Sequence, residues 1–206
     1  MRGYLAMMHD RGVQSVKPME VMQLLAGHHM DDPYGMSGVL GMNNRPRRKP
    51  TRLPGFDYRL PGPYFVTICT HGRVHRFGAI VQDEIHLNSA GEMVAATWES
   101  IPEQFPAAVV DLFVVMPNHF HGLIWFTVHG GGANPSLGDA MKWFKAGTTN
   151  KYIRGVRTGE WLPFDGHLWQ RNYHEHVVRN DADMDRIRTY IINNPATWAN
   201  DTNNVP

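Results

Sequence analysis

Hydrophobic residues recur along the chain with two different periods from residue 64 onward, and the changes of period mark the predicted elements. The segment YFVTICT at 64–70 is rich in β-branched and aromatic residues, which favours a strand. AIVQDEIHL at 79–87 follows as a hairpin-like stretch. Residues 89–101 open with SAGE, the form of a capping box, and continue with apolar residues at helical spacing until Pro102. The first half of this region therefore predicts a strand, a hairpin and a helix.

The second half predicts five more elements, separated by turn residues and by a glycine-rich break at 130–134. They are strands at 109–116 and 119–128 joined by a Pro117-Asn118 turn, a helix capped by Ser136, a strand at 168–177, and a helix from Asp181 to Pro195.

This order is β-α-β-β-α-β followed by one extra helix, so the sequence predicts an α/β protein of the α+β type with a ferredoxin-like sheet. The strand at 119–128 is apolar on both faces, because Phe120 and Ile124 alternate with Leu123 and Trp125. Both faces of the sheet therefore need cover. The additional C-terminal helix, which carries Tyr190, is expected to cover the second face.

Composition narrows the class of protein. The 206 residues fit one domain, the formal net charge is +1, and the one cysteine, Cys69, fits a reducing compartment. No run of about 18 apolar residues predicts a membrane span. We therefore expect a cytoplasmic protein with no membrane partner, in which any nucleic-acid binding depends on local basic clusters.

The N-terminal region differs from the rest. Eight of the twelve methionines fall at or before Met42, among residues with little periodicity, so residues 1–44 are expected to be a disordered tail or to follow a mis-called start, with the true start at Met42. Residues 45–55 form an extended basic arm, either a solvated linker or a contact to phosphates, and residues 56–206 form the domain. The arm's cations are Arg45, Arg47, Arg48, Lys49 and Arg52.

Two histidines provide the first candidate chemistry. His119 and His121 are two apart in a predicted strand, so their rings project from the same face, as in a two-imidazole metal site. The alternative is that one or both rings are hydrogen-bonded core histidines. Gly122 beside them permits close approach of a helix or of DNA, or serves packing.

The last helix provides a second pair. Tyr190 and Asn194 are four apart and lie at the edge of its apolar stripe, where the helix meets the sheet. His119, His121 and Asn194 would then offer a divalent cation two nitrogens and an oxygen, with Tyr190 as nucleophile. Taken singly, Tyr190 is also consistent with a core-edge tyrosine and Asn194 with a helix-terminal asparagine.

Three ordered motifs carry a resemblance. PNHFHGLI at 117–124, LWQRNYHEHVVRN at 168–180 and IRTYIINNP at 187–195 resemble the single-tyrosine HUH transposases, most closely the REP-associated tyrosine transposases. YFVTICTHGR at 64–73 is similar to their first strand, and the resemblance covers about residues 56–198. Members commonly have glutamine where this chain has Asn194.

The resemblance implies a metal-dependent enzyme that cleaves and rejoins single-stranded hairpin DNA through a 5′-phosphotyrosine. His119, His121 and Asn194 would bind Mg²⁺ or Mn²⁺, and Tyr190 would attack the phosphate. It also implies a nucleoid-associated monomer or homodimer. The helix after Ser136 and its C-terminal end would supply further DNA-binding cations, namely Lys142, Lys145, Lys151, Arg154 and Arg157.

Other interpretations remain at the level of sequence. His174-Glu175-His176 is a second H-x-H, whose charged middle residue makes it the weaker candidate for the metal pair. A rolling-circle initiator or relaxase shares the same nuclease chemistry, and a noncatalytic ferredoxin-like nucleic-acid-binding module shares the order of elements. The chain lacks the RRM aromatic signature and the H-E-x-x-H motif of zinc hydrolases.

Overall fold

The structure is a computed structural model that describes residues 57–127 and 135–204. The predicted tail at 1–44, the basic arm at 45–55 and the break at 130–134 lie outside the described residues. The elements within them are β1 (Gly62–Cys69), η1 (His71–Arg73), β2 (Gly78–Val81), β3 (Glu84–Leu87), α3 (Ser89–Glu99), α4 (Ile101–Gln104), β4 (Ala108–Val115), β5 (His119–Phe126), α5 (Leu137–Arg157), β6 (His174–Val177), α6 (Asp181–Asn193) and η2 (Trp198–Asn200).

The main sheet has the strand order β4-β5-β1-β6, and each neighbouring pair is antiparallel. The two central strands, β5 and β1, are joined along their full length from Gly62–Phe126 to Cys69–His119. The short strands β2 and β3 form a separate hairpin. This α+β arrangement, with helices connecting an antiparallel sheet in β-α-β-β-α-β order, confirms the predicted fold class.

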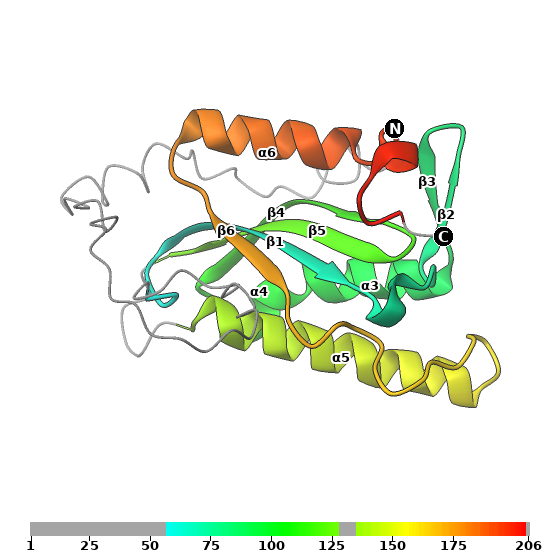
Figure 1. Cartoon of the computed structure of the whole chain (residues 1–206). Helices are drawn as coiled ribbons and strands as arrows, with labels where there is room; N and C mark the ends of the chain where they lie inside the picture. The colour runs from blue at the N-terminus through cyan, green and yellow to red at the C-terminus, as the bar shows by residue number, and fades with distance from the viewer. Residues whose placement is uncertain (1–56, 128–134, 205–206) are drawn as a thin grey trace, which may run out of the picture.

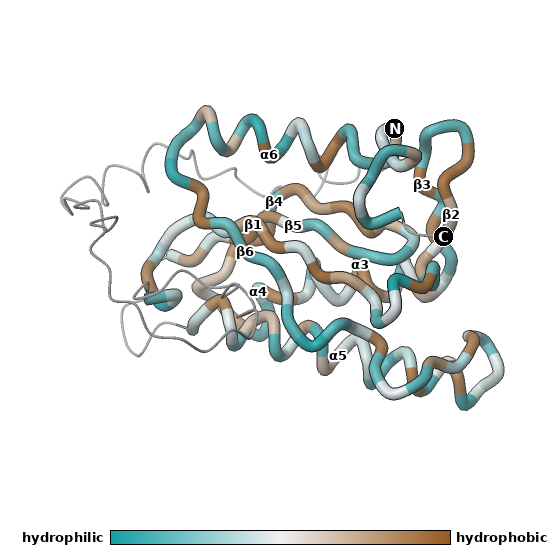
Figure 2. Tube along the Cα trace, viewed as in Figure 1, coloured by the Kyte–Doolittle hydropathy of each residue, from teal (hydrophilic) through white to brown (hydrophobic). Residues whose placement is uncertain are grey.

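Helices cover both faces of the sheet (Figure 1). On one face, α3 and α5 enclose the larger hydrophobic cluster, which contains Trp98, Phe120 and Phe144. On the other face, α6 packs over a smaller cluster of Leu123, Val178, Met184, Ile187 and Ile191. The central strands are largely hydrophobic, whereas the edge strand β6 is hydrophilic (Figure 2). The additional helix therefore covers the second face, as the two-sided apolar pattern of β5 predicts.

Several predicted boundaries are wrong in detail. The α3 cap is Asn88, whose side chain accepts a hydrogen bond from Gly91 N; Ser89 is the first helical residue, and its hydroxyl accepts from Trp161 Nε1 instead. Pro102 ends no element, because it lies in the first turn of α4, where a missing N–H costs no hydrogen bond. By contrast, Ser136 caps α5 in a full capping box with Asp139, as predicted.

The strand predicted at 168–177 is reduced to β6. Residues 168 to 173 make one isolated bridge, from Trp169 to Thr70. The backbone carbonyls of Gln170 and Arg171 accept hydrogen bonds from Lys145 Nζ, which ties this segment to α5. Among the described residues, no helix is both long and apolar enough to cross a bilayer.

Candidate metal centre and tyrosine

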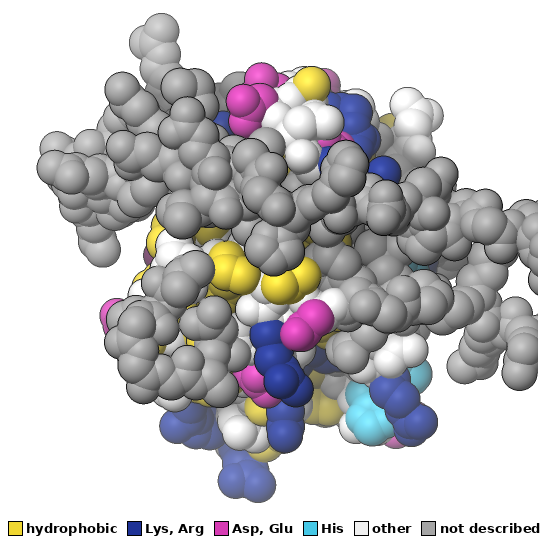
Figure 3. Space-filling view, turned by 90° about the vertical axis from the view of Figure 1, so that its left-hand side faces the viewer, with side chains coloured by type: hydrophobic (Ala, Val, Ile, Leu, Met, Phe, Trp, Pro, Cys, Tyr) yellow, Lys and Arg dark blue, Asp and Glu magenta, His cyan; other side chains and the backbone are white. Residues whose placement is uncertain are grey.

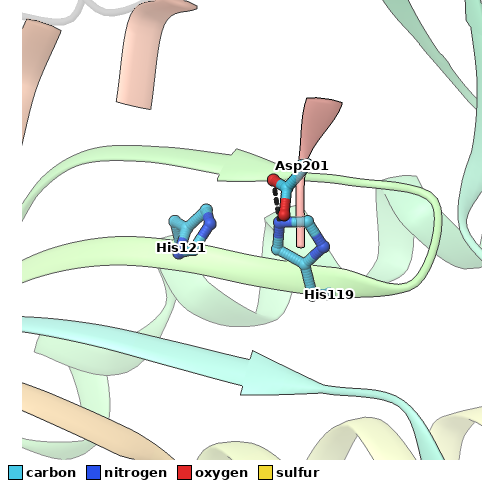
Figure 4. A group of neighbouring side chains, drawn as sticks. All are labelled: His119, His121 and Asp201. Atoms are coloured by element: carbon cyan, nitrogen blue, oxygen red, sulfur yellow. Dashed lines mark ion pairs between the residues drawn. The ribbon is translucent and has the colours of Figure 1, made fainter. Parts of the chain in front are cut away.

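His119 and His121 lie side by side on β5 and face α6. Their ring centroids are 4.5 Å apart, and the two residues are 0% and 2% exposed. Figure 4 shows both rings on the same side of the strand, with Asp201 over His119. The alternation of side chains along a strand thus produces the predicted pair.

The His119 ring is oriented by its neighbour Asn118, which is fully buried. Asn118 Nδ2 donates to the backbone carbonyls of Arg73 at 3.0 Å and of Asn203 at 2.8 Å, which fixes the amide so that Oδ1 faces His119. His119 Nδ1 lies 2.9 Å from this oxygen and therefore carries the hydrogen. Nε2 is left with a free lone pair and has no hydrogen-bond partner among the described residues.

The His121 ring is held by two residues of the neighbouring strand β1. Thr67 Oγ1 lies 2.8 Å from Nδ1, and the Phe65 ring stacks on the imidazole with centroids 5.4 Å apart. We assign the hydrogen to Nδ1, which donates to Thr67, so that Nε2 is an acceptor. An imidazole whose Nδ1 is fixed by a hydrogen bond in this way presents its Nε2 to a metal ion or to a hydrogen-bond donor.

Tyr190 reaches the same point from α6. Its hydroxyl lies 3.2 Å from His121 Nε2, and its ring packs edge-on against Phe65. The residue is 42% exposed, so the phenol stands at the boundary between the buried imidazoles and solvent. A hydroxyl group at such a boundary is accessible to a molecule from solvent without unfolding of the sheet.

Asn194, the cap residue at the end of α6, joins the group. It is 1% exposed, and its Nδ2 donates to Asp201 Oδ2 at 3.4 Å. Its Oδ1 has no hydrogen-bond partner within the described part of the chain. The predicted set of His119, His121, Tyr190 and Asn194 is thus brought together in the fold.

Asp201 is a site residue that the sequence did not indicate. Its Oδ2 lies 3.8 Å from His119 Nε2, and ligand atoms of His119, His121 and Asp201 all lie within 4.8 Å of one another. Asp201 is placed by an Asx-type contact, in which its Oδ1 accepts from Asn203 N. The segment around it is polar and aperiodic, so no hydrophobic period marks Asp201 as a residue of this group.

The segment after α6 is anchored around the histidines. Trp198 stacks on the His119 ring with centroids 5.8 Å apart. Asn203 O accepts from Asn118, and Asn203 Oδ1 accepts a short hydrogen bond from the Arg73 guanidinium. Arg73 has a φ of 56°, in the left-handed region that is unfavourable for a residue with a Cβ. The contacts to Asn118 and Asn203 hold it there.

The electrostatics keep both imidazoles neutral. Burial lowers the pKa of His119 to about 4, although the Asp201 carboxylate opposes the shift. Burial, and then the neighbouring His119, lower the pKa of His121 well below its ordinary value. Burial, and then Asp201, raise the pKa of Tyr190. Neutral imidazoles are the form that binds metal ions, whereas the protonated phenol needs help to lose its proton.

These donors fit a divalent cation. Within the described ranges, His119 Nε2 and Asn194 Oδ1 are buried polar atoms without hydrogen-bond partners, and such atoms cost free energy unless a ligand satisfies them. The group of two imidazoles and one carboxylate could hold a metal ion.

The second H-x-H pair is placed differently. His174 and His176 lie on β6 opposite Thr67 and Phe65, on the same face as the candidate metal centre but at the edge of the sheet. His176 Nε2 lies 2.7 Å from Asp183 Oδ2, and His174 is exposed. Within the described residues, neither His174 nor His176 belongs to the cluster of candidate metal ligands formed by His119, His121 and Asp201.

The predicted DNA-binding cations lie on α5, which covers the opposite face of the sheet from α6 (Figure 1). Lys145 Nζ is bound to two backbone carbonyls, and Lys151 Nζ donates to Thr97 Oγ1 at 2.9 Å. Lys142, Arg154 and Arg157 are exposed. In Figure 3, Lys and Arg side chains gather toward the bottom, where α5 lies, whereas acidic and basic side chains mix over α6 at the top. Their contact with DNA stays a prediction, and the arm's cations lie outside the described residues.

Comparisons with known proteins place the chain in a family. No family model matches it. It is 36% identical over 171 residues to an uncharacterized protein of Haemophilus influenzae strain Rd, a match that covers 75% of this chain and 91% of that protein. The chain belongs to the same family as this Haemophilus influenzae protein.

Two solved structures are similar in fold. One is a REP-associated tyrosine transposase bound to a REP hairpin, with a TM-score of 0.46, 19% identity, and coverage of 66% of this chain and 68% of that chain. The other, from Deinococcus radiodurans R1, is provisionally described as a transposase, with a TM-score of 0.43, 18% identity, and coverage of 69% and 95%. Both scores are below 0.5, so neither likeness carries an argument about function.

Proposed function

We propose that this protein is a transposase-like enzyme that cleaves single-stranded DNA at a hairpin and transfers the strand through a covalent tyrosine intermediate. The observation that carries the proposal is the 3.2 Å separation of Tyr190 Oη and His121 Nε2, beside His119 Nε2 and Asn194 Oδ1, which have no hydrogen-bond partner in the part of the chain that the structure describes. A noncatalytic binding module has no need of buried polar atoms without partners next to a half-exposed phenol. The three sequence motifs that resemble HUH transposases support the same reading.

A divalent cation, Mg²⁺ or Mn²⁺, would be held by His119, His121 and Asn194, with Asp201 as a further anionic ligand. Such an ion offsets negative charge that develops on a phosphate and lowers the barrier to attack. Asn118 and Thr67 keep the two imidazole Nε2 atoms directed at this position. The site residues therefore combine two oriented neutral nitrogens with two oxygens, a mixed set that suits an ion binding a phosphate oxygen.

Tyr190 would supply the nucleophile. In the cleavage step a bond forms between Tyr190 Oη and phosphorus, and the bond from phosphorus to the 3′ oxygen breaks, which leaves a 5′-phosphotyrosine and a free 3′-OH. The phenol proton passes to water, and the 3′ oxygen takes up a proton. One phosphodiester replaces another of similar energy, so attack by a second 3′-OH reverses the step and joins strands without ATP.

The class of DNA substrate follows from how a phosphate can reach the Tyr190 hydroxyl. A phosphate must bend to the edge of α6 to reach the phenol, which a folded single strand does more easily than a continuous duplex. We therefore propose that hairpin DNA binds in preference to a blunt duplex of the same sequence, and that binding weakens moderately as salt rises. Equal affinity for both DNAs at one salt concentration would contradict this substrate class.

The test uses a hairpin-bearing oligonucleotide labelled at its 5′ or 3′ end, incubated with protein and Mn²⁺, and resolved on a denaturing gel. The wild type should give a shifted band that carries only the DNA on the 3′ side of the nick. Tyr190→Phe should give no such band, while metal and hairpin binding stay near wild type. Tyr173→Phe is the matched control and should keep the band.

The metal arm of the test uses His119→Ala and His121→Ala, which should abolish cleavage and Mn²⁺ binding measured by calorimetry. The controls are His174→Ala and His176→Ala, at the edge of the same sheet face. A covalent band that persists in Tyr190→Phe would overturn the proposed nucleophile, and a requirement for the 174/176 pair would overturn the proposed metal site.

A further inference from the structure

A β-bulge in β4 turns two consecutive side chains toward α6. Val110 pairs with Ile124 and Phe113 pairs with Gly122, so both Asp111 and Leu112 stand opposite Leu123. An ordinary strand would send one of them to the opposite face of the sheet. Here Leu112 packs against the hydrophobic cluster under α6, and Asp111 is placed beside the same helix. Bulges commonly redirect a side chain near functional sites.

Asp111 holds α6 through Arg188. Arg188 Nη2 lies 2.5 Å from Asp111 Oδ2, with the two side chains 32% and 21% exposed. The carboxylate is itself fixed, because its Oδ1 accepts from Leu112 N at 2.7 Å and Trp125 Nε1 approaches its Oδ2 at 3.4 Å. A fixed carboxylate at partial burial orients a guanidinium better than a mobile surface acid does.

Arg188 and Tyr190 stand on opposite flanks of α6. At about 100° per residue they are about 160° apart around the helix. Between them lies the buried stripe of Met184, Ile187 and Ile191. Any rotation of the helix about its axis that pulls Arg188 away from β4 therefore also moves Tyr190 relative to His121.

The hydrophobic cluster between α6 and the sheet is small, so its apolar contacts alone fix the rotation of α6 about its axis only weakly. For a helix of about 10–12 Å diameter, a roll of about 20° moves a side chain at its surface by about 2 Å. Misplacement of a reacting group by about 1 Å can lower a rate about 100-fold.

We propose that Asp111 and Arg188 are positioning residues that set the rotation of α6 and thereby place the Tyr190 hydroxyl at His121 Nε2. This inference rests on the proposed function for its consequence in catalysis. A second contact to the sheet, from His176 to Asp183, anchors the start of the helix. The Asp111–Arg188 pair holds the helix nearer the proposed nucleophile, because Arg188 lies two residues before Tyr190 in the sequence. The neighbouring Arg186–Asp183 pair lies within α6 and cannot set its rotation against the sheet.

The test compares Arg188→Ala, Asp111→Asn and Arg188→Lys with Arg186→Ala as the matched control, since Arg186 also pairs with an acid at 2.5 Å. At saturating hairpin DNA, Arg188→Ala and Asp111→Asn should lower the cleavage rate about 10- to 100-fold with unchanged hairpin affinity. Combining the two should lower the rate no further than either alone, because both remove one interaction. Arg188→Lys should recover part of the rate, and Arg186→Ala should match wild type.

A second readout is independent of activity. Protein labelled with 3-fluorotyrosine has a ¹⁹F resonance for Tyr190, assigned by its loss in Tyr190→Phe. This resonance should shift in Arg188→Ala and Asp111→Asn and stay in place in Arg186→Ala. If the wild type does not cleave but the resonance shifts, the proposed function fails and the positioning role stands.

If the wild type cleaves, and Arg188→Ala and Asp111→Asn cleave equally well with an unmoved resonance, the positioning role is overturned while the proposed function stands. A melting curve of each variant checks folding. Should Arg188→Ala fail to fold, Arg188→Lys and Asp111→Asn decide the question by the same two readouts.

Discussion

Thr67 on β1 and His121 on β5 are cross-strand partners, and the threonine hydroxyl lies 2.8 Å from Nδ1 of the imidazole. The contact joins the register of the two central strands to the direction of one candidate metal ligand. A slip of one residue in this register would turn the hydroxyl to the opposite face of the sheet.

Thr67→Val should therefore weaken metal binding while the fold is kept. Valine has the same shape but cannot accept the hydrogen of Nδ1, so the ring loses its fixed orientation. We expect the affinity for Mn²⁺ to fall about 10- to 100-fold in calorimetry. Thr127→Val is the matched control, because its hydroxyl bonds the Ala107 carbonyl at the far end of β5. Equal Mn²⁺ affinity in both variants would show that Thr67 does not orient the ligand.

Asp201→Asn tests the carboxylate that completes the centre. The substitution keeps the shape and removes the charge next to His119, so Mn²⁺ affinity should fall by about tenfold or more if the carboxylate is a ligand. Asp185→Asn, an exposed acid on α6, is the control and should leave affinity unchanged. Calorimetry at constant ionic strength measures the Mn²⁺ affinity of both variants. An unaltered Mn²⁺ affinity in Asp201→Asn would show that the carboxylate is not a ligand.

The start of α6 should lose stability in acid through Asp183. Burial raises the pKa of this carboxyl, but hydrogen bonds from His176, Arg186 and the Arg179 backbone lower it by more, and the pKa is about 2. A folded pKa below the unfolded value of about 3.8 means that the ionised group stabilises the fold above pH 3.8, and that this contribution disappears as the pH falls toward 2.

The measurement is urea unfolding of wild type and Asp183→Asn at a series of pH values. Near neutral pH the variant should be less stable by about 1 to 2 kcal/mol, and the difference should shrink to near zero by about pH 2. A difference that is constant with pH would mean that the charge of Asp183 plays no part.

Gly122 is required by packing. A Cβ at this position would lie 2.7 Å from Phe120 Cε1 and 2.7 Å from Trp98 Cζ2, two rings in the tightly packed main core. Gly122→Ala should destabilise the protein by about 1 to 3 kcal/mol in urea or thermal unfolding. The control is Gly147→Ala in α5, where the nearest atom is 3.8 Å away and alanine should be neutral or stabilising. Unchanged stability of Gly122→Ala would show that the rings can move aside.

Periodicity predicted the parts of the site that follow from regular structure. The strand alternation placed His119 and His121 on one face, and the helical spacing placed Tyr190 and Asn194 at the edge of α6. Asp201 was missed because it follows the last helix in an aperiodic segment, whose contacts to Arg73 and Asn118 join positions far apart in the sequence.

Three other differences between the predicted and observed elements also have physical causes. Asn88 caps α3 in place of Ser89, since either side chain can accept from the first turn and tertiary contacts decide. The bulge at Asp111 adds one residue to β4 without any glycine or proline to mark it. The segment before the four-residue β6 is tied to α5 by Lys145, whose contact to Gln170 joins positions 25 apart, beyond the reach of any local pattern.

The division of the centre between β5 and α6 also has a consequence for synthesis. Tyr190 follows His121 by 69 positions, so the ribosome completes the histidine pair long before it adds the tyrosine. A product cut short between them would carry the imidazoles but no hydroxyl to attack a phosphate. Under the proposed function, incomplete chains could therefore not nick DNA, whatever structure their central strands have already formed.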